Sequence, residues 1–507
     1  MVTSPPAGSA PAREPVHVIG LLTALIGLAL VLLLPRPAGL PVAGQIMLGL
    51  LLFSVILWMT EAVDYAISAV LITALMAFLL GLAPNAAKPE AVLGTTAALT
   101  LALSGFANTA LALVGAACFI SAAMTLTGLD KRIALFILSL VGARTKRVVV
   151  GAILVGIVLS FLVPSTTARV ACLVPIVMGI ILAFGVDKRS RFAGLLMIAT
   201  AQAASIWNVG VKTAAAQNMV AIGFIEKAFG QTITWLDWLI AAAPWSIGMS
   251  IALYFVMTRM MPPETEEIAG GKDTIRQALR ALGPMTGAEW RLLLIMLTLL
   301  GLWSTEKVLH PFDTSSTTIA AIALMFTPGI GVMGWKQAQS KIPWGTIVLF
   351  GTGISLGTAL LQTQAAAWLA HLIVAHLGLA GASAFMILAL LSLFLIVVHL
   401  GFASATALAS AMVPIMISVL QQIAGDQSSV SGAAPLNLIG MTLLLQFVVS
   451  FGFILPVNAP QNMVAYGTDT FSAKDFVRTG LVLTVIGYGL VLLLGATYWS
   501  WMGYLSH

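Results

Sequence analysis

Charged residues are scarce in this chain. Of its 507 residues, 8% are Asp, Glu, Lys or Arg, whereas 60% are hydrophobic. A soluble globular domain carries roughly 25% charged residues, so this composition excludes a chain that water surrounds on every side. Apolar runs of about 20 residues, the length that crosses the hydrocarbon core of a bilayer, recur along the whole sequence. The composition therefore predicts an all-α polytopic membrane protein.

Cysteine is rare as well, and motifs of catalysis are missing. Cys118 and Cys172 lie in apolar runs, and we interpret them as small buried side chains rather than as a disulfide or metal pair. We find no metal-ligand cluster, nucleophile–base pair or ATP-binding loop, because the glycines of 351–357 (GTGISLG) follow no strand and are typical of helix packing. The net charge of +6 resides in loops between spans and does not indicate a nucleic-acid partner. The sequence thus predicts a chain that is not an enzyme and needs no cofactor.

The apolar runs outline the segments of the chain. They fall at about 17–35, 41–59, 65–83, 99–129, 148–163, 168–186, 192–224, 234–258, 290–305, 316–333, 343–375, 382–402, 406–422, 436–466 and 478–500. Residues 1–16 are rich in Pro, Ser and Ala and are predicted to form a disordered tail, and 17–40 to form an additional first span that is retained. The long polar stretch 259–289 is predicted to connect two halves on the cytoplasmic side.

Three motifs occur twice, in the same order. LWMTEAV at 57–63 returns as LWSTEKV at 302–308, STTARVACLVPI at 165–176 as SATALASAMVPI at 404–415, and QNMVA at 217–221 as QNMVA at 461–465. The offsets, from 57 to 302, from 165 to 404 and from 217 to 461, are 245, 239 and 244 residues. Three matches in register indicate an internal duplication. The two copies are predicted at 41–258 and 290–500, with the first span outside them.

Each copy contains two short apolar segments that are joined by a polar tip, at 164–167 in the first copy and at 404–406 in the second. Short segments with a polar tip favour a re-entrant helical hairpin, which is tolerated only where it lines a cavity. If the hairpins do not cross the membrane, each copy has five spans, and an odd number inverts the second copy. The expected architecture is therefore about 11 transmembrane helices plus two re-entrant hairpins in two inverted-topology repeats.

The distribution of Lys and Arg agrees with this arrangement. With a cytoplasmic N-terminus, Arg36, Lys88, Lys227 and Lys307 fall outside, Arg169 and Lys212 fall within membrane segments, and the other eighteen of the 24 cations fall on cytoplasmic segments. Such a bias is the positive-inside pattern. It predicts a multi-pass protein of the cytoplasmic membrane whose N-terminus lies in the cytoplasm.

The two tips are the strongest candidates for a binding site. Inverted repeats with interrupted helices are typical of secondary transporters, whose sites lie at the repeat interface. Free N–H groups and positive helix ends suit an anion, and hydroxyls can donate to carboxylate oxygens. The candidate residues are Ser165, Thr166 and Thr167 in the first tip and Ser404, Ala405 and Thr406 in the second. The alternative is that these Ser and Thr side chains only cap the following helices.

The QNMVA motifs follow stretches that are broken by polar, Gly or Pro residues, WNVGVKTAA at 207–215 and LPVNAP at 455–460. We interpret both stretches as unwound turns opposite the tips, after which a helix restarts at the motif. The candidate substrate ligands in these turns are Asn218, Asn458 and Asn462. For the neighbouring Gln217 and Gln461, polar packing between helices is the alternative to a role in binding.

Two cations and two acids complete the candidates. An ammonium within a membrane segment is costly and suggests a functional site by default, so Lys212 is the sharpest single candidate. Arg169 is the second, and its alternatives are to snorkel or to bond to hairpin carbonyls. Glu61 and Glu306 follow Trp-x-Thr at span ends and are interpreted as helix-capping or packing residues.

After residue 40, the chain resembles the divalent anion:sodium symporter (DASS) family over essentially its whole length. That family has a Ser-Asn-Thr motif at each hairpin tip, where this chain has Ser165-Thr166-Thr167 and Ser404-Ala405-Thr406, and W-x-T-E-A-V near its start, which is matched at 58–63. VPSTTAR at 163–169, HLGFASATALASA at 399–411 and LPVNAPQN at 455–462 resemble the branch of citrate/succinate and 2-oxoglutarate/malate exchangers.

The resemblance implies a homodimer that moves di- or tricarboxylates, less often sulfate, by an elevator mechanism. Scaffold spans would occupy 41–140 and 290–376, and moving hairpins with their broken helices would occupy 145–258 and 382–500. If sodium were bound, the resemblance would place it at Ser165, Thr166, Gly210, Ala405, Asn458 and Pro460.

Departures from the family pattern bear on coupling. Both motif Asn residues are replaced, by Thr166 and Ala405, the Thr before the last Pro is Ala459, and Lys212 stands in a loop that helps to bind sodium in symporters. A fixed ammonium would leave an empty carrier charged within the membrane, whereas a bound anion would neutralise it. We therefore expect sodium-independent exchange of carboxylates, and the alternative is sodium-coupled symport of a dicarboxylate or sulfate.

Overall fold

Helices make up nearly all of the computed structural model, which describes residues 15–85, 88–142, 144–183, 185–266, 271–379, 381–428 and 435–506. Within these ranges, the strands are β1 (Pro84–Asn85) and β2 (Lys88–Val92), which pair in antiparallel orientation. Of the tail predicted at 1–16, residues 1–14 lie outside the described residues, and the first helix begins at Pro15.

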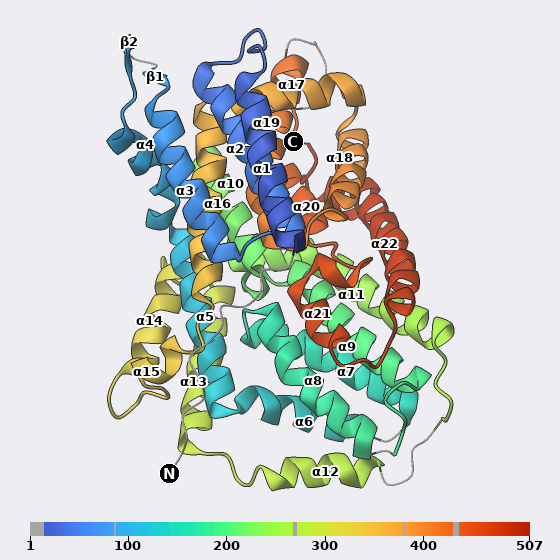
Figure 1. Ribbon diagram of the computed structural model, residues 1–507. Helices are drawn as coiled ribbons and strands as arrows, with labels where there is room; N and C mark the ends of the chain where they lie inside the picture. The colour runs from blue at the N-terminus through green and yellow to red at the C-terminus, as the bar shows by residue number, and fades with distance from the viewer. Residues whose placement is uncertain are drawn as a thin grey trace.

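The helices follow one another as Figure 1 shows. Before the connection they are α1 (Pro15–Leu33), α2 (Val42–Thr60), α3 (Tyr65–Gly81), α4 (Thr95–Ala102), η1 (Ser104–Ala107), α5 (Thr109–Thr127), α6 (Leu129–Val141), α7 (Thr145–Leu162), α8 (Thr166–Ala183), α9 (Arg191–Gly210), η2 (Lys212–Ala214), α10 (Ala216–Phe229) and α11 (Trp235–Met260). From the connection onward they are α12 (Gly271–Ala281), α13 (Gly287–Ser304), α14 (Thr314–Phe326), α15 (Trp335–Gln339), α16 (Trp344–Gln362), α17 (Ala365–Leu377), α18 (Ala384–His399), α19 (Ala405–Ser428), α20 (Leu438–Val449), η3 (Pro456–Asn458), α21 (Pro460–Tyr466), α22 (Ala473–Ala496) and α23 (Tyr498–Trp501).

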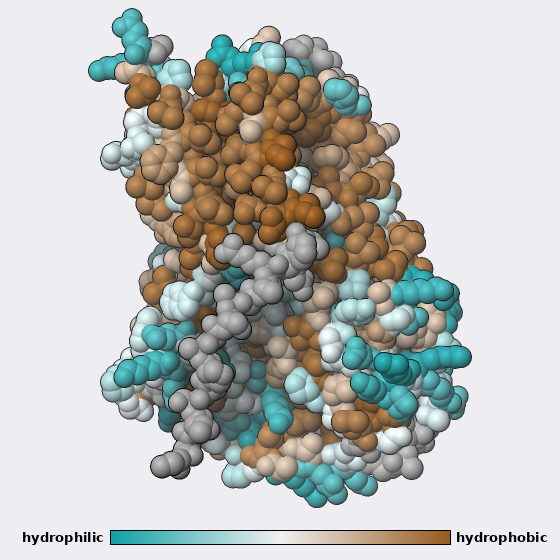
Figure 2. Space-filling view, viewed as in Figure 1, coloured by the Kyte–Doolittle hydropathy of each residue, from teal (hydrophilic) through white to brown (hydrophobic). Residues whose placement is uncertain are grey.

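Apolar surface covers much of the molecule. Among the described residues, nine helices are long and apolar enough to cross a membrane, and shorter apolar helices such as α3 and α14 accompany them. Figure 2 shows hydrophobic residues over a broad upper region of this face, while hydrophilic residues gather mainly in its lower part and at its upper end. Large apolar side chains such as Leu33 and Phe78 are exposed, as lipid-facing residues are. The prediction of an all-α polytopic membrane protein is confirmed.

Two apolar runs that look continuous in the sequence are divided in the structure. The run at 99–129 spans parts of α4, η1 and α5, and Asn108 caps α5 by accepting a hydrogen bond from the amide of Ala110 at 2.7 Å. The run at 343–375 contains α16 and α17, which Gln364 separates with a left-handed φ of 63°. Hydropathy identifies both runs, but it does not indicate where a single residue starts or ends a helix.

The order α7–α8–α9–η2–α10–α11 returns as α18–α19–α20–η3–α21–α22. In each set, two helices meet at a polar tip, and a later helix ends at a 3₁₀ turn before the next one starts. Figure 1 draws α7 and α8 in the lower half of the view and α18 and α19 in the upper half. Because α8 packs against α21 and α10 against α19, the two sets meet in the middle of the molecule.

A second group of helices, α2, α3, α5, α13, α14 and α16, stands beside these sets on the left of Figure 1. α3 packs on α16 and α5 on α14. Gly105 of η1 approaches α16 so closely that an added Cβ would collide with the carbonyl of Gly351, and its amide donates to the Ser355 hydroxyl oxygen at 2.9 Å. The glycine-rich stretch 351–357 therefore packs helices, as its sequence predicts.

The connection between the halves is anchored at both ends. Thr145, at the start of α7, donates from its amide to the carbonyl of Glu266 at 3.0 Å. Arg132 of α6 pairs with Glu289 of α13 at 2.6 Å and donates to the carbonyl of Gly283 at 2.9 Å. α12 lies between these anchors, at the lower edge of Figure 1.

Candidate substrate-binding site

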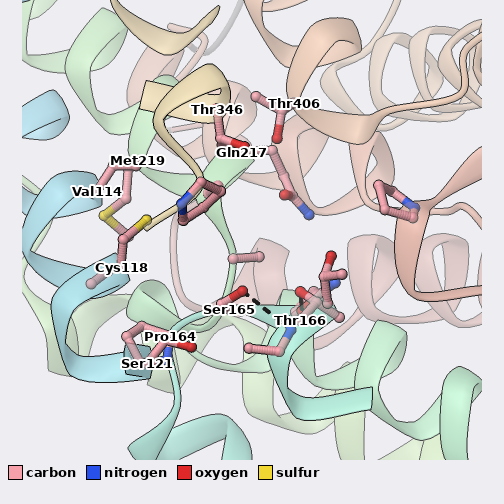
Figure 3. Close-up of a pocket in the computed structure, with 18 of the residues that line it drawn as sticks. Val114, Cys118, Ser121, Pro164, Ser165, Thr166, Gln217, Met219, Thr346 and Thr406 are labelled. Atoms are coloured by element: carbon pink, nitrogen blue, oxygen red, sulfur yellow. Dashed lines mark hydrogen bonds between the residues drawn. The ribbon is translucent and has the colours of Figure 1, made fainter. Parts of the chain in front are cut away.

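A cavity of about 450 Å³ lies where the two sets of helices meet. Its lining comes from both tips, from both interrupted helices, and from α5, α13, α14 and α16. Figure 3 shows Ser165 and Thr166 on one side of this space and Thr406 and Gln217 on the other. Segments that are distant in sequence but carry matching motifs therefore meet in one place.

The first tip forms where α7 gives way to α8. Pro164 cannot continue α7 in a regular way, because its ring fixes φ and removes the backbone N–H. Ser165 then accepts a hydrogen bond from the amide of Ala168 at 3.3 Å, which caps α8. The amides of Thr166 and Thr167, in the first turn of α8, have no partner within the helix and are available to an anion.

The second tip repeats this geometry between α18 and α19. Ser404 accepts a hydrogen bond from the amide of Ala407 at 3.4 Å. A capping serine accepts through its oxygen, so its own proton stays available to donate to a carboxylate. Capping and substrate binding by Ser165 and Ser404 are therefore compatible.

The side chain of Arg169 turns toward the protein interior instead of into the cavity. It is fully buried and donates to the carbonyls of Val163 at 3.0 Å, Ala214 at 3.1 Å and Ala204 at 3.3 Å. Among the described residues, no carboxylate forms an ion pair with it. A fixed positive charge thus lies next to the first tip and is bonded to one hairpin carbonyl and to carbonyls of α9 and η2. A bond to a hairpin carbonyl is one of the alternatives that the sequence leaves open.

Asn208, at the end of α9, is a residue that the sequence reasoning missed. Its Oδ1 accepts hydrogen bonds from the Thr166 hydroxyl and from the Arg169 guanidinium, both at 2.6 Å. The single hydroxyl proton of Thr166 is therefore directed to Asn208, and Thr166 has none left to donate to a substrate. The sequence signal for Asn208 is an amide side chain at the end of an apolar segment, just before the break at η2.

Near the second tip, Asn458 of η3 bonds backbone carbonyls, as Arg169 does near the first. Its buried Nδ2 donates to the carbonyls of His399 and Phe402 at 3.0 Å and of Leu400 at 3.4 Å. Its Oδ1 accepts the amide of Leu455 at 3.1 Å. Carbonyls near the second tip are thus bonded by a neutral amide, whereas those near the first tip are bonded by a guanidinium.

The Asn residues of the QNMVA motifs hold the interrupted helices together. Nδ2 of Asn218 donates to the carbonyl of Asn208 at 2.7 Å, and Nδ2 of Asn462 to that of Gly452 at 2.8 Å, in each case ten residues earlier. Both side chains are buried and lie outside the cavity lining. In this structure they fix the restart of α10 and α21, and their contact with substrate stays a prediction.

The Gln residues of the same motifs reach across to the other half. Nε2 of Gln217 donates to Oγ of Ser450 at 3.1 Å, and Nε2 of Gln461 donates to Oγ of Ser205 at 3.1 Å. Both glutamines line the cavity. Polar packing between helices thus accounts for Nε2 of each glutamine, and each residue also lines the cavity.

The ammonium of Lys212 lies outside the cavity lining. Its Nζ donates to the carbonyl of Ile233 at 2.7 Å and to Oγ1 of Thr314 at 3.4 Å, and the Thr314 hydroxyl donates to Glu306 at 2.7 Å. Glu306 also accepts the amide of Trp235 at 3.3 Å and so caps α11, as its sequence predicts. Lys212 thus joins η2 to the segment just before α11 and to the start of α14, and its contact with substrate stays a prediction.

Two further acids stand at helix ends. Asp313 precedes α14 and accepts the amides of Ser315 and Ser316. Burial raises the pKa of Asp313, but hydrogen bonds from the Ser316 hydroxyl and from these amides outweigh burial and hold the pKa below its ordinary value. Glu61 ends α2 with a left-handed φ of 46° and accepts the Tyr65 hydroxyl at 3.0 Å.

The structure brings one group of predicted site residues together. The cavity lining contains Ser165, Thr166, Thr167, Ser404, Ala405, Thr406 and Pro460. The residues outside the lining are Arg169, Gly210, Lys212, Asn218, Asn458 and Asn462. Within the described part of the chain, no group of three His, Cys, Asp or Glu residues could hold a metal ion. The cavity offers hydroxyl and amide donors, which suit an anion.

Comparison with known proteins agrees with this chemistry. The family model described as sodium:sulfate symporter transmembrane region matches residues 16–505. A membrane protein of Cupriavidus necator is 53% identical over 96% of this chain and 93% of its own length. The sodium-dependent dicarboxylate transporter SdcS of Staphylococcus saprophyticus is 24% identical over 94% of this chain and 90% of its own length, and the citrate/succinate antiporter of Escherichia coli K12 is 26% identical over 78% and 80%.

Comparison with solved structures supports the fold. The YdaH transporter of Alcanivorax borkumensis superimposes with a TM-score of 0.50 at 15% identity, over 85% of this chain and 96% of that one. The family model covers almost the whole chain, and the relatives that are named for an activity are transporters. The chain therefore belongs to the sodium:sulfate symporter family, that is, to the divalent anion:sodium symporters, and it is a membrane transporter rather than an enzyme.

Proposed function

We propose that this chain exchanges one di- or tricarboxylate anion for another across the cytoplasmic membrane, without coupling to sodium. The cavity lining holds hydroxyl and amide groups and Lys341 but no Asp or Glu among the described residues. The starts of α8 and α19 both contribute to the lining, and helix starts carry partial positive charge. Relatives named for dicarboxylate and citrate transport support carboxylates as the anions.

One observation supports sodium independence: the carbonyls near the tips already accept hydrogen bonds from fixed donors. A hard cation is held by oxygen atoms that are free to coordinate it. Here Arg169 already bonds the carbonyls of Val163 and Ala214, and Asn458 bonds those of His399 and Phe402. A sodium ion would have to share these carbonyls with fixed donors, one of which is itself a cation.

The same guanidinium supports obligatory exchange. Without substrate, the first tip carries the unpaired charge of Arg169 in a low-dielectric region, and moving such a charge through the membrane is costly. A bound dianion offsets this charge from the other side of the tip. The loaded carrier should then cross much more readily than the empty one, which makes uptake depend on substrate on the opposite side.

The proposal includes an elevator mechanism in a homodimer with inverted repeats. The set α7–α11 with α18–α22 would move against the group formed by α2, α3, α5, α13, α14 and α16. The cavity lies between these two parts and draws lining residues from both, which is where an elevator carrier holds its substrate. Inversion is supported by the opposite ends at which Figure 1 draws the two hairpins. We place the N-terminus in the cytoplasm on the evidence of the positive charges.

Reconstituted protein tests the coupling directly. Uptake of labelled citrate or succinate is measured in proteoliposomes with and without internal substrate, each with and without a sodium gradient. We expect uptake that requires internal substrate and ignores sodium. Robust sodium-driven uptake into empty liposomes would overturn the proposal in favour of sodium symport.

Arg169→Gln separates the charge from the hydrogen bonds, because glutamine keeps a donor but is neutral. We expect uptake into empty liposomes to rise toward the level seen with internal substrate. Lys212→Gln is the matched control, since it removes a second buried cation that lies outside the cavity lining. If only Lys212→Gln raises uptake into empty liposomes, the charge that makes exchange obligatory is that of Lys212 and not that of Arg169.

A further inference from the structure

The two glutamines of the repeated motif both line the cavity. Gln217 and Gln461 are each 6% exposed, and both belong to the lining. Figure 3 shows the Gln217 amide between Thr406 on one side and Thr166 on the other. Gln461 holds the equivalent position in the second QNMVA motif. The Gln217 amide thus lies between residues of the two tips in this view, and Gln461 lines the same cavity.

The orientation of the Gln461 amide follows from its partner. The Ser205 hydroxyl donates its single proton to the carbonyl of Ala201 at 3.1 Å. Ser205 can then only accept from Gln461, so the NH₂ group of Gln461 must face Ser205. The carbonyl oxygen of Gln461 is thereby directed away from Ser205, and the amide cannot exchange its ends without losing this bond.

The oxygen of this amide has no partner in the protein. In the described part of the chain, Oε1 of Gln461 and of Gln217 accepts no hydrogen bond. The oxygens of Gln202 and Gln446, which also have no partner, are sealed from solvent, whereas those of Gln217 and Gln461 are not. An accessible acceptor on a residue that lines the cavity is available to a ligand.

We propose that Gln461, assisted by Gln217, selects dianions that carry a hydrogen-bond donor between their two carboxylates, such as hydroxydicarboxylates. The tips supply donors from Ser165 and Ser404, which suit carboxylates at the two ends of a substrate. The acceptor between them suits a hydroxyl in its middle. This selection rests on the proposed function, because that function places carboxylates at the tips. A dicarboxylate without the hydroxyl would cover the Gln461 oxygen and leave it unpaired.

Three probes of similar size test the selection. Malate carries the hydroxyl, succinate lacks it, and O-methylmalate keeps the oxygen but loses the proton. Their affinities are measured by titration calorimetry on the purified full chain. We expect malate to bind about tenfold more tightly than O-methylmalate and succinate, which corresponds to one hydrogen bond. Equal affinity for the three probes, or tighter binding of succinate, overturns the proposal.

Two variants identify the residue responsible. Gln461→Leu removes the acceptor and should bring the ratio of malate affinity to succinate affinity to within about twofold. Ser205→Ala leaves the cavity lining intact but releases the amide, so it should lower the same ratio by a smaller factor. If Gln461→Leu weakens all three probes equally, Gln461 is structural and the proposal fails.

The outcomes separate this selection from the proposed function. Binding of all dicarboxylates without discrimination removes the role of Gln461 and leaves carboxylate transport in place. Absence of binding by every carboxylate, in protein that exchanges another anion such as sulfate, removes both. A Gln461→Leu variant that does not fold leaves the wild-type ratio and Ser205→Ala as the deciding measurements, because neither depends on that substitution.

Discussion

The two hairpin tips are built alike but are supported differently. Each has a serine that caps the following helix, Ser165 for α8 and Ser404 for α19. Near the first tip, the donor to the surrounding carbonyls is the guanidinium of Arg169, and near the second it is the neutral amide of Asn458. Both side chains do the same structural work, which is to satisfy buried carbonyls. The difference is one elementary charge, and it lies on one side of the cavity.

This difference indicates which tip controls the energy of the empty carrier. A neutral amide can satisfy carbonyls at no electrostatic cost, so Asn458 demonstrates that the positive charge of Arg169 is not required for geometry alone. Under the proposed function, a bound anion would offset the charge of Arg169 at the first tip. The comparison therefore predicts that removing the Arg169 donor near the first tip alters coupling and stability, whereas removing the Asn458 donor near the second tip alters stability alone.

The largest expected effect is in thiol labelling, which reports the side of the membrane from which each hairpin enters. After Cys118 and Cys172 are replaced, single cysteines at 188, beyond α8, and at 426, near the end of α19, should be labelled from opposite sides of the membrane by an impermeant thiol reagent. A cysteine at 276 on α12 is the control and should be labelled from the same side as 188. Labelling of 188 and 426 from one side would refute inversion.

Removing the donors should destabilise the first tip more than the second. Arg169→Leu leaves the carbonyls of Val163, Ala204 and Ala214 without their partner, at roughly 1–3 kcal/mol for each buried group. Asn458→Leu also orphans carbonyls but removes no charged hydrogen bonds, so its cost should be lower. The free energy of unfolding in detergent measures both. A greater loss of unfolding free energy in Asn458→Leu than in Arg169→Leu would contradict this comparison of the two tips.

Removing the tip hydroxyls should affect the two sides equally. Ser165→Ala and Ser404→Ala each lose a donor to a carboxylate, and we expect substrate affinity to fall by about 1.5–3 kcal/mol, as for a hydrogen bond to a charged group. Loss of the caps lowers stability by about 1 kcal/mol in the absence of substrate, and that value serves as the baseline. Unchanged affinity in both folded variants would remove the tips from the site.

The smallest effect is expected at Thr166, which lines the cavity but donates to Asn208. Thr166→Val should cost roughly 1 kcal/mol of stability, because a buried hydrogen bond is lost. Substrate affinity should change by less than about twofold, in contrast to Ser165→Ala one residue earlier. An affinity loss as large as that of Ser165→Ala would indicate that the Thr166 proton serves the substrate.

Much of the architecture can be predicted from this sequence. Apolar run lengths identify most of the helices, and the paired motifs identify both tips and both breaks, because an interruption inside an apolar run requires polar or helix-breaking residues. The start of α5 and the end of α16 are not predictable in this way. They depend on single side chains and left-handed residues, such as Asn108 and Gln364, inside runs of uniform hydropathy.

The direction of long side chains is the part that sequence reasoning does not reach. Arg169 and Lys212 are both cations in membrane segments, yet one bonds carbonyls near the first tip and the other extends toward Glu306 and Thr314. Gln461 finds its partner Ser205 in the opposite half. These choices follow from contacts between segments far apart in the chain, which no local pattern encodes.

The anchored connection has a mechanical consequence. Its first anchor, between Thr145 and Glu266, belongs to the part that would move, and its second, between Arg132 and Glu289, belongs to α6 and α13. The chain between these anchors has a finite length, which limits how far the two anchors can move apart. A residue adds about 1.5 Å in a helix and at most about 3.5 Å when extended, so α12 can stay folded only over a limited stroke. If the proposed elevator motion exceeded that stroke, α12 would have to unwind, and the stretched connection would pull the moving part back.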